Sequence, residues 1–194
     1  CYGFDPRAFF EFAQKRFELI YDEHLVVEDE GGIICSARNV PLEQNLRGIW
    51  KRMGGIAMVA SAPEKRRRGY IRELMRQFFE DMHKSKMVCS TLYPFKDTFY
   101  GSFGYVNCPA VIFGVVNPMQ FKLWRNLPEG YHVERLTFDE GFQLFKEIHG
   151  QAIETIHGAA RRPEKRWNEY EMRGRDWFAV VFNSKGKAEG IMAY

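Results

Sequence analysis

The run Arg66-Arg67-Arg68-Gly69 combines residue types and spacing that can bind a phosphate group. It lies between an apolar run and an amphipathic segment, which we predict to be a strand and a helix. The first turn of a helix has free backbone N–H groups and the positive end of the helix dipole. A glycine lets an anion approach the backbone, and guanidinium groups are forked donors suited to phosphate oxygens. The pattern therefore predicts a cradle for a diphosphate.

The cradle does not match the common nucleotide motifs. No Gly-Lys-Ser/Thr follows, as a Walker loop requires, and a single glycine is too few for a dinucleotide fingerprint. An unliganded surface loop and a nucleic-acid patch stay open as alternatives at this point. Residues 161–166 form a second basic run, which we interpret as the solvated start of a helix rather than as a nucleic-acid contact. The formal net charge of +3 is too small to favour a nucleic-acid partner.

The elements that must position the cradle follow from apolar patterning. Residues 54–61 form a continuous apolar run between glycines and Pro63, which predicts a strand buried on both faces. Residues 69–85 show helical periodicity and predict an amphipathic helix. Residues 88–92 predict another strand, stopped by Pro94. The apolar face of the helix consists of Ile71, Leu74, Met75, Phe78, Phe79 and Met82.

The neighbouring segments complete a mixed α/β (α+β) pattern. We predict a helix over residues 6–20, a hairpin with strands at 25–27 and 33–35, a short helix and glycine turn within 97–105, and a strand at 111–116. The order is strand, strand, strand, helix, strand, short helix, strand. This order predicts a mixed central sheet with helices on its faces.

A second unit is expected after a boundary rich in proline and glycine at residues 117–130. Thr137 and Glu140 have capping-box spacing, and Pro163 opens another predicted helix. Residues 177–194 contain two apolar runs around a glycine turn, which resembles the first hairpin. We therefore expect domains at residues 1–116 and 117–194, the second being a partial copy of the fold of the first.

Composition sets outer limits on function. The 194 residues are 45% hydrophobic and 15% aromatic, enough for a substantial core. No apolar run approaches the roughly 18 residues that span a membrane, so we expect no membrane partner and take the cytoplasm as the default location. The four cysteines form no Cys-x-x-Cys pair and the histidines lack ligand spacing, so we expect no metal. The sequence lacks an initiator Met and stops within a predicted strand, so we expect a longer protein whose first domain is trimmed at its N-terminus.

Two segments resemble the GNAT acetyltransferases. The segment from Val59 to Ile71 is similar to their acetyl-CoA motif, Arg/Gln-x-x-Gly-x-Gly/Ala, with Arg66 and Gly69 matching and Ile71 in place of a small residue. That bulky residue, together with residues 92–95 and the pattern Phe-Tyr-x-x-Phe-Gly-Tyr at 99–105, resembles the Eis-like (enhanced intracellular survival) branch. The resemblance covers residues 20–116, and no sharp motif extends it into 117–194. The C-terminal sterol-carrier-like domain of that branch has no counterpart in this sequence.

The resemblance implies a GNAT-like fold, followed by part of a second GNAT-like unit, with acetyl-CoA as co-substrate. The pantetheine arm would bond to the main chain of the apolar strand, whose N–H groups would polarise the thioester carbonyl. The diphosphate would bind at the cradle. The implied cofactor-binding residues are Val59, Ala60, Ser61, Arg66, Arg67, Arg68, Gly69, Tyr70, Ile71 and Phe95.

The resemblance also implies direct attack by an amine, without a covalent enzyme intermediate. Tyr100 matches the general acid of the family, which protonates the leaving thiolate. The base of the family is a carboxylate at the C-terminus of the full-length protein, which Tyr194 does not supply, so the base is absent or another group serves. The acceptor would be a small molecule or a lysine side chain, and assembly into a homo-oligomer is implied. A non-catalytic module that binds CoA or a partner protein remains the alternative.

Overall fold

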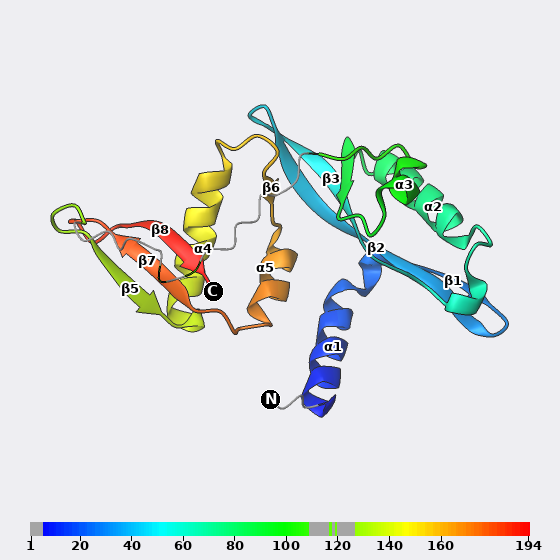
Figure 1. The fold of residues 1–194 in the computed structure, drawn as a ribbon, viewed down its shortest axis with the longest axis horizontal. Helices are drawn as coiled ribbons and strands as arrows, with labels where there is room; N and C mark the ends of the chain where they lie inside the picture. The colour runs from blue at the N-terminus through cyan, green and yellow to red at the C-terminus, as the bar shows by residue number, and fades with distance from the viewer. Residues whose placement is uncertain (1–5, 109–116, 118, 120–126) are drawn as a thin grey trace. The chain divides into compact units, whose positions relative to one another are not determined.

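The computed structural model describes residues 6–108, 117, 119 and 127–194 (Figure 1). Contacts divide the chain into two compact units. Unit 1 comprises Cys1–Tyr93 and Gly150–Gly174, and unit 2 comprises Pro94–His149 and Arg175–Tyr194. The expected domain division at residue 117 stays a prediction.

Unit 1 is built on a mixed β-sheet, which confirms the predicted fold class. Its strands are β1 (His24–Asp29), β2 (Gly32–Leu46), β3 (Ile49–Ser61) and β4 (Cys89–Leu92), hydrogen-bonded in that order. β1 and β2 pair antiparallel, as do β2 and β3, whereas β4 runs parallel to β3. A two-residue strand, β6 (Ala160–Arg161), pairs with β2 and was not predicted. β2 and β3 are much longer than predicted.

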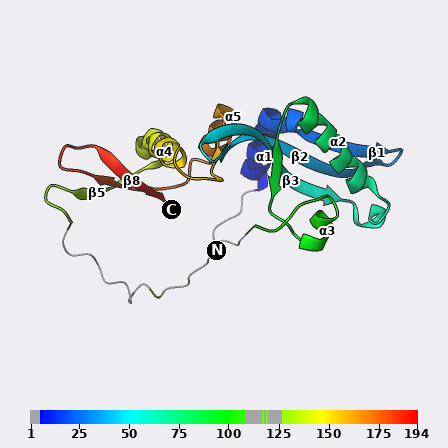
Figure 2. The ribbon, with the colours of Figure 1, turned by 90° about the horizontal axis from the view of Figure 1, so that it is seen from above.

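Helices cover both faces of this sheet. They are α1 (Pro6–Ile20), the short η1 (Tyr21–Glu23) and η2 (Pro63–Lys65), α2 (Tyr70–Lys84) and α5 (Glu164–Glu171). α2 packs against β1, β2 and β3 (Figure 2). Its predicted apolar face is confirmed, because Leu74, Met75, Phe78 and Met82 are all buried. The opposite face of the sheet meets α5, through Arg38 of β2.

Gly54 allows α2 to lie close to β3. A Cβ at this position would lie 2.5 Å from Cε of Met82 and 2.7 Å from Oδ1 of Asn39. Met82 is only 5% exposed, so its side chain has little room to move aside. The contact between strand and helix therefore requires a residue without a side chain.

Replacing Gly54 with alanine is expected to destabilise the protein by about 1–3 kcal/mol, because the added methyl overpacks a filled site. Urea unfolding monitored by circular dichroism measures the change. Gly150→Ala is the control, since a Cβ there meets nothing within 4 Å and its backbone needs no left-handed conformation. Equal stabilities of the two variants would contradict this account of the packing.

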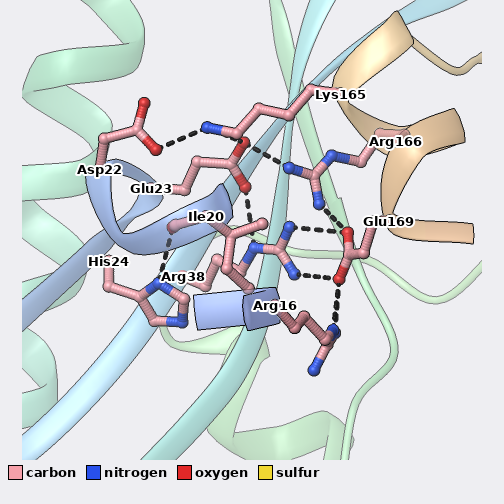
Figure 3. A network of polar contacts seen from close by, with 9 residues as sticks. All are labelled: Arg16, Ile20, Asp22, Glu23, His24, Arg38, Lys165, Arg166 and Glu169. Carbon is pink, nitrogen blue, oxygen red and sulfur yellow. Dashed lines mark hydrogen bonds and ion pairs between the residues drawn. The ribbon is translucent and has the colours of Figure 1, made fainter. Parts of the chain in front are cut away.

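A buried network of charges joins η1, β2 and α5 on the face away from α2 (Figure 3). Arg38 donates through Nε to Glu23 at 2.8 Å and through both terminal nitrogens to Glu169 at 3.1 Å. Arg166 donates to the same two carboxylates, at 2.5 Å for Glu23. Arg16 adds a bond of 2.7 Å to Glu169. Two central guanidinium groups are thus matched by two carboxylates from distant parts of the chain.

The prediction that residues 161–166 form a solvated helix start is wrong for Arg166. A helix does begin there, as predicted, but Arg166 is buried at its start. Its charge is compensated by Glu23, which lies 143 residues earlier in the sequence. Burial of a paired arginine avoids the large penalty of burying an isolated charge.

Glu169→Gln is expected to destabilise the protein by about 3–5 kcal/mol, because Arg38 and Arg166 would remain buried with too little negative charge. Glu73→Gln serves as the control, since Glu73 pairs with Arg76 on the surface of α2. Exposed pairs of that kind contribute at most about 1 kcal/mol. Urea midpoints compare the variants, and similar losses would show that the network does not stabilise the fold.

The described residues of unit 2 include a three-stranded antiparallel sheet, in the order β5 (His132–Leu136), β7 (Phe178–Phe182), β8 (Ala188–Ala193). They also include the helix α3 (Asp97–Gly101) and α4 (Phe138–Ile153) as far as His149, since the last residues of α4 belong to unit 1. The hairpin of β7 and β8 confirms the prediction, as does the capping box, in which the Thr137 N–H donates to Glu140 at 2.9 Å. β5 was not predicted. The predicted strand at 111–116 lies outside the described residues.

Among the described residues, no helix combines the length and apolarity needed to cross a bilayer. Within the same ranges, no three His, Cys, Asp or Glu side chains group in a way that would hold a metal ion.

Candidate functional site

β3 changes its geometry three residues before its end. Ser36 pairs with Ala60 and Arg38 with Ala57, so Met58 and Val59 together oppose a single residue of β2. Met58 has a φ of 54°, a left-handed conformation that is uncommon for a residue with a side chain. This β-bulge bends the strand and redirects its side chains, as bulges beside binding sites do.

The prediction that residues 54–61 are buried on both faces is wrong for the end of the strand. Gly54 and Ile56 are buried, but Ala60 is exposed and Met58 is 53% exposed. The apolar run indicated burial because continuous hydrophobicity is typical of central strands. Hydrophobicity alone does not indicate what covers each residue, and the bulge lies in this exposed stretch.

One edge of β3 also loses its partner strand at this end. The parallel ladder with β4 runs only from the Met53–Cys89 pair to the Ile56–Leu92 pair. Among the described residues, nothing continues this ladder along residues 57–61. A strand edge with free N–H and C=O groups can pair with an extended ligand.

The turn from β3 into α2 leaves the amides of the helix N-terminus open. Arg67 and Gly69 adopt positive φ values of 62° and 89°. Gly69 is the N-cap residue of α2, and no side chain caps the helix. The first intrahelical bond runs from the Glu73 N–H to the Gly69 carbonyl, at 3.1 Å. The preceding N–H groups are thus free for a ligand, and a Cβ at Gly69 would meet nothing within 4 Å.

The loop is anchored at its base. Lys65 donates to Asp29 at 2.5 Å, and the Ala62 N–H donates to the Ile34 carbonyl at 2.8 Å. The hydrogen bond from Lys65 is also the main cause of the lowered pKa of Asp29. These contacts fix the start of the loop to β1 and β2. A fixed loop holds its remaining donors in place for a ligand.

The three arginines of the loop have no ion-pair partner among the described residues. Arg66, Arg67 and Arg68 are exposed, and none forms an ion pair with any residue whose position is described. Three such guanidinium groups beside an uncapped helix N-terminus are a donor set that fits a diphosphate. This turn would therefore hold the diphosphate of a CoA molecule.

Tyr100 lies in an aromatic cluster of unit 2. It is 5% exposed, and its ring contacts those of Phe99 at 5.1 Å, Phe95 at 5.5 Å and Tyr105 at 6.0 Å between centroids. Burial raises the pKa of Tyr100 above its ordinary value of 10.0. The hydroxyl therefore keeps its proton at neutral pH and can act as an acid.

The structure distributes the predicted site residues over both units. Those on β3, the loop and α2 belong to unit 1, whereas Phe95 and Tyr100 belong to unit 2. Sequence reasoning missed the Lys65–Asp29 anchor, for which the only signal was an acidic turn between the first two strands. It also missed the bulge at Met58. Val59, Ser61, Tyr70 and Ile71 are half-buried, and Ala60, Gly69, Phe95 and the three arginines are exposed.

The family follows from comparison with known families. Residues 1–107 match the family described as acetyltransferase (GNAT) domain. Because the match covers more than half of the chain, the chain belongs to this family. A search of the curated proteins found no match.

Solved structures share the fold. A probable N-acyltransferase of unknown function from Enterococcus faecalis V583 has a TM-score of 0.74 and 24% identity, covering 94% of this chain and 47% of that one. A GCN5-related N-acetyltransferase from Kribbella flavida has a TM-score of 0.63 and 22% identity, and the match covers 98% of this chain and 51% of that one. Eis1 from Mycobacterium abscessus has a TM-score of 0.67 and 18% identity, and the match again covers 98% of this chain and 51% of the other. The chain thus spans about half the length of each, and these identities establish similarity of fold.

Arg67→Ala combined with Arg68→Ala is expected to weaken CoA binding about 10-fold or more, because two charge-assisted contacts of roughly 1 kcal/mol each would be lost at an exposed site. Isothermal titration calorimetry at fixed salt measures the effect. Lys51→Ala combined with Lys84→Ala removes the same charge from other exposed positions and should bind CoA as the wild type does. Equal weakening in both double variants would point to net charge rather than to the cradle.

Proposed function

We propose that this chain is the acetyl-CoA-binding part of an N-acetyltransferase that transfers an acetyl group to an amine. The observation that carries the proposal is the uncapped N-terminus of α2, which is flanked by the bulged end of β3 and by three arginines that form no ion pair with the described residues. Membership of the GNAT family supports it. In this proposal Val59, Ala60, Ser61 and Phe95 contact the acyl-pantetheine arm, and residues 66–71 hold the diphosphate.

Acetyl-CoA supplies the acetyl group as a thioester. A backbone N–H at residues 59–61 donates to the carbonyl oxygen and stabilises the negative charge that develops there during attack. The amine attacks the carbonyl carbon directly, the C–S bond breaks, and no acyl group becomes attached to the protein. The departing sulfur carries negative charge and requires a proton.

Tyr100 is proposed to provide that proton. A thiol such as that of CoA has a pKa near that of cysteine, about 8.5, below that of tyrosine at about 10. Transfer of the Tyr100 proton to the thiolate is uphill by the difference between these pKa values, and the proton that the attacking amine loses restores the Tyr100 hydroxyl, so that the products are the amide and the CoA thiol. The supporting observation is the place of Tyr100 in a buried aromatic cluster, where its hydroxyl stays protonated at neutral pH, although the raised pKa makes it a weaker acid than an exposed tyrosine. The proposal does not assign the base that removes the proton from the attacking amine.

The finer classification is also proposed. The motifs at 59–71, 92–95 and 99–105 support placement in the Eis-like branch, as does the shared fold with Eis1. We propose an acetyl-CoA-binding domain at 1–116, a partial GNAT-like domain at 117–194, and a cytoplasmic protein that assembles into homo-oligomers. The acceptor is an amine of a small molecule or of a lysine side chain. Neither nucleic acid nor a membrane is a proposed partner.

An acceptor screen tests the proposed function. The purified chain is incubated with acetyl-CoA and an aminoglycoside, a polyamine or a lysine-containing peptide, and released CoA is measured with a thiol reagent. We expect amine-dependent thiol release with at least one acceptor. Binding of acetyl-CoA without turnover on any acceptor would favour the alternative, a non-catalytic CoA- or partner-binding module.

Tyr100→Phe is expected to lower kcat about 100-fold or more while leaving KM for acetyl-CoA nearly unchanged, because only the proton donor is removed. In the wild type, turnover should fall as pH rises through the raised pKa of Tyr100, above 10, and this alkaline limb should be missing in the variant. Steady-state kinetics across pH measure both effects. Tyr93→Phe, at a fully exposed position, is the control. Unchanged turnover in Tyr100→Phe would reject the general-acid role.

A further inference from the structure

A cavity, separate from the cradle, opens on the face of the sheet away from α2 in unit 1. It has a volume of about 470 Å³ and lies between β2 and α5. Val40 and Leu42 of β2 form its floor. They alternate with residues such as Asn39, whose side chain faces Met82 of α2, so the cavity lies on the face away from α2. Its volume falls within the range of about 300–1,000 Å³ that is typical of small-molecule sites.

The polar lining of this cavity is dominated by arginine. Arg162, Arg166 and Arg173 face a single carboxylate, that of Glu169. Glu169 already accepts hydrogen bonds from Arg16, Arg38 and Arg166, so its negative charge is balanced within the buried network. The cavity therefore has an excess of positive charge.

One buried donor in this lining lacks a partner. Arg166 is 7% exposed at its side chain, and its two terminal nitrogens donate to Glu169 and Glu23. Its Nε makes no hydrogen bond with any described residue, and the atom is itself almost completely buried. This donor therefore offers no accessible surface to a ligand, which would be bound instead by Arg162 and Arg173 of the lining.

The other two arginines support an anionic ligand. Arg162 stacks over the Trp167 ring at 5.0 Å, and its burial lowers its pKa, so a nearby anion would stabilise its charge. Arg173 is exposed and makes no ion pair with the residues that are described in this structure. Together they place guanidinium groups both within the cavity and at its surface.

The apolar part of the lining defines the rest of the ligand. Val40 and Leu42 contribute aliphatic surface, and Tyr170 contributes an aromatic ring. We propose that this cavity binds a small organic anion, with a carboxylate or phosphate head group on the arginines and an apolar body against β2 and Tyr170. The site is independent of acetyl-CoA binding at the cradle.

Titration with matched probes tests the proposal. Hexanoate, hexyl phosphate and hexylammonium share one apolar chain and differ in head group. We expect hexanoate or hexyl phosphate to bind in calorimetry and hexylammonium to give no signal. The stronger of the two anions identifies the head group. Binding should persist with saturating acetyl-CoA and in Arg67→Ala combined with Arg68→Ala, so that failure of the cradle and failure of this site are distinguishable.

Variants assign the binding to the cavity. Arg162→Gln and Arg173→Gln are each expected to weaken anion binding about 10-fold, whereas Arg175→Gln, at an exposed position outside the cavity, should not change it. Arg166 is left intact because it holds the buried network. Thermal unfolding checks that each variant is folded. If Arg162→Gln does not fold, the result for Arg173→Gln decides whether the cavity binds the anion. The proposal is overturned if neither anion binds at millimolar concentration, if hexylammonium binds equally well, or if both folded variants bind like the wild type.

Discussion

The reversal of the chain from β3 into α2 is the constraint on which the candidate site depends. Gly69 starts the helix in a left-handed conformation without a capping side chain, so the first amides of α2 face solvent. The reversal is held from both sides, because Lys65 binds Asp29 at its base and Gly54 lets α2 pack directly on β3. A rigid base with free donors above it is the arrangement that an anion requires.

The opposite face of the same sheet carries a buried network of charges. Arg38 and Arg166 share the carboxylates of Glu23 and Glu169, and this network connects η1, β2 and α5. Buried ion pairs stabilise a fold only when their hydrogen bonds are nearly complete. Here one donor, Nε of Arg166, has no partner among the described residues, and an arginine-lined cavity lies beside the network. Arginine side chains thus gather at two separate places in unit 1, the cavity and the loop that precedes α2.

The sequence allowed prediction of features that depend on local patterns. The spacing from Ile71 to Met82 predicted α2, and the arginine-glycine run predicted a basic loop before it, because both signals lie within one segment. The lengths of β2 and β3 were missed, because Pro41 and the charged Lys51 give no local strand signal and the pairing between the two strands outweighs such local preferences. Burial of Arg166 and the bulge at Met58 depend on residues in other elements, which periodicity does not register.

Amide chemical shifts would test the central claim most directly. Titration of unlabelled CoA into ¹⁵N-labelled protein should shift the amide signals of residues 69–72 and 59–61 most strongly, because the proposed diphosphate and pantetheine contacts are to those N–H groups. The account predicts saturable shifts at both segments, and smaller ones around α5. Strong shifts confined to other segments, or no shifts in properly folded protein, would contradict it.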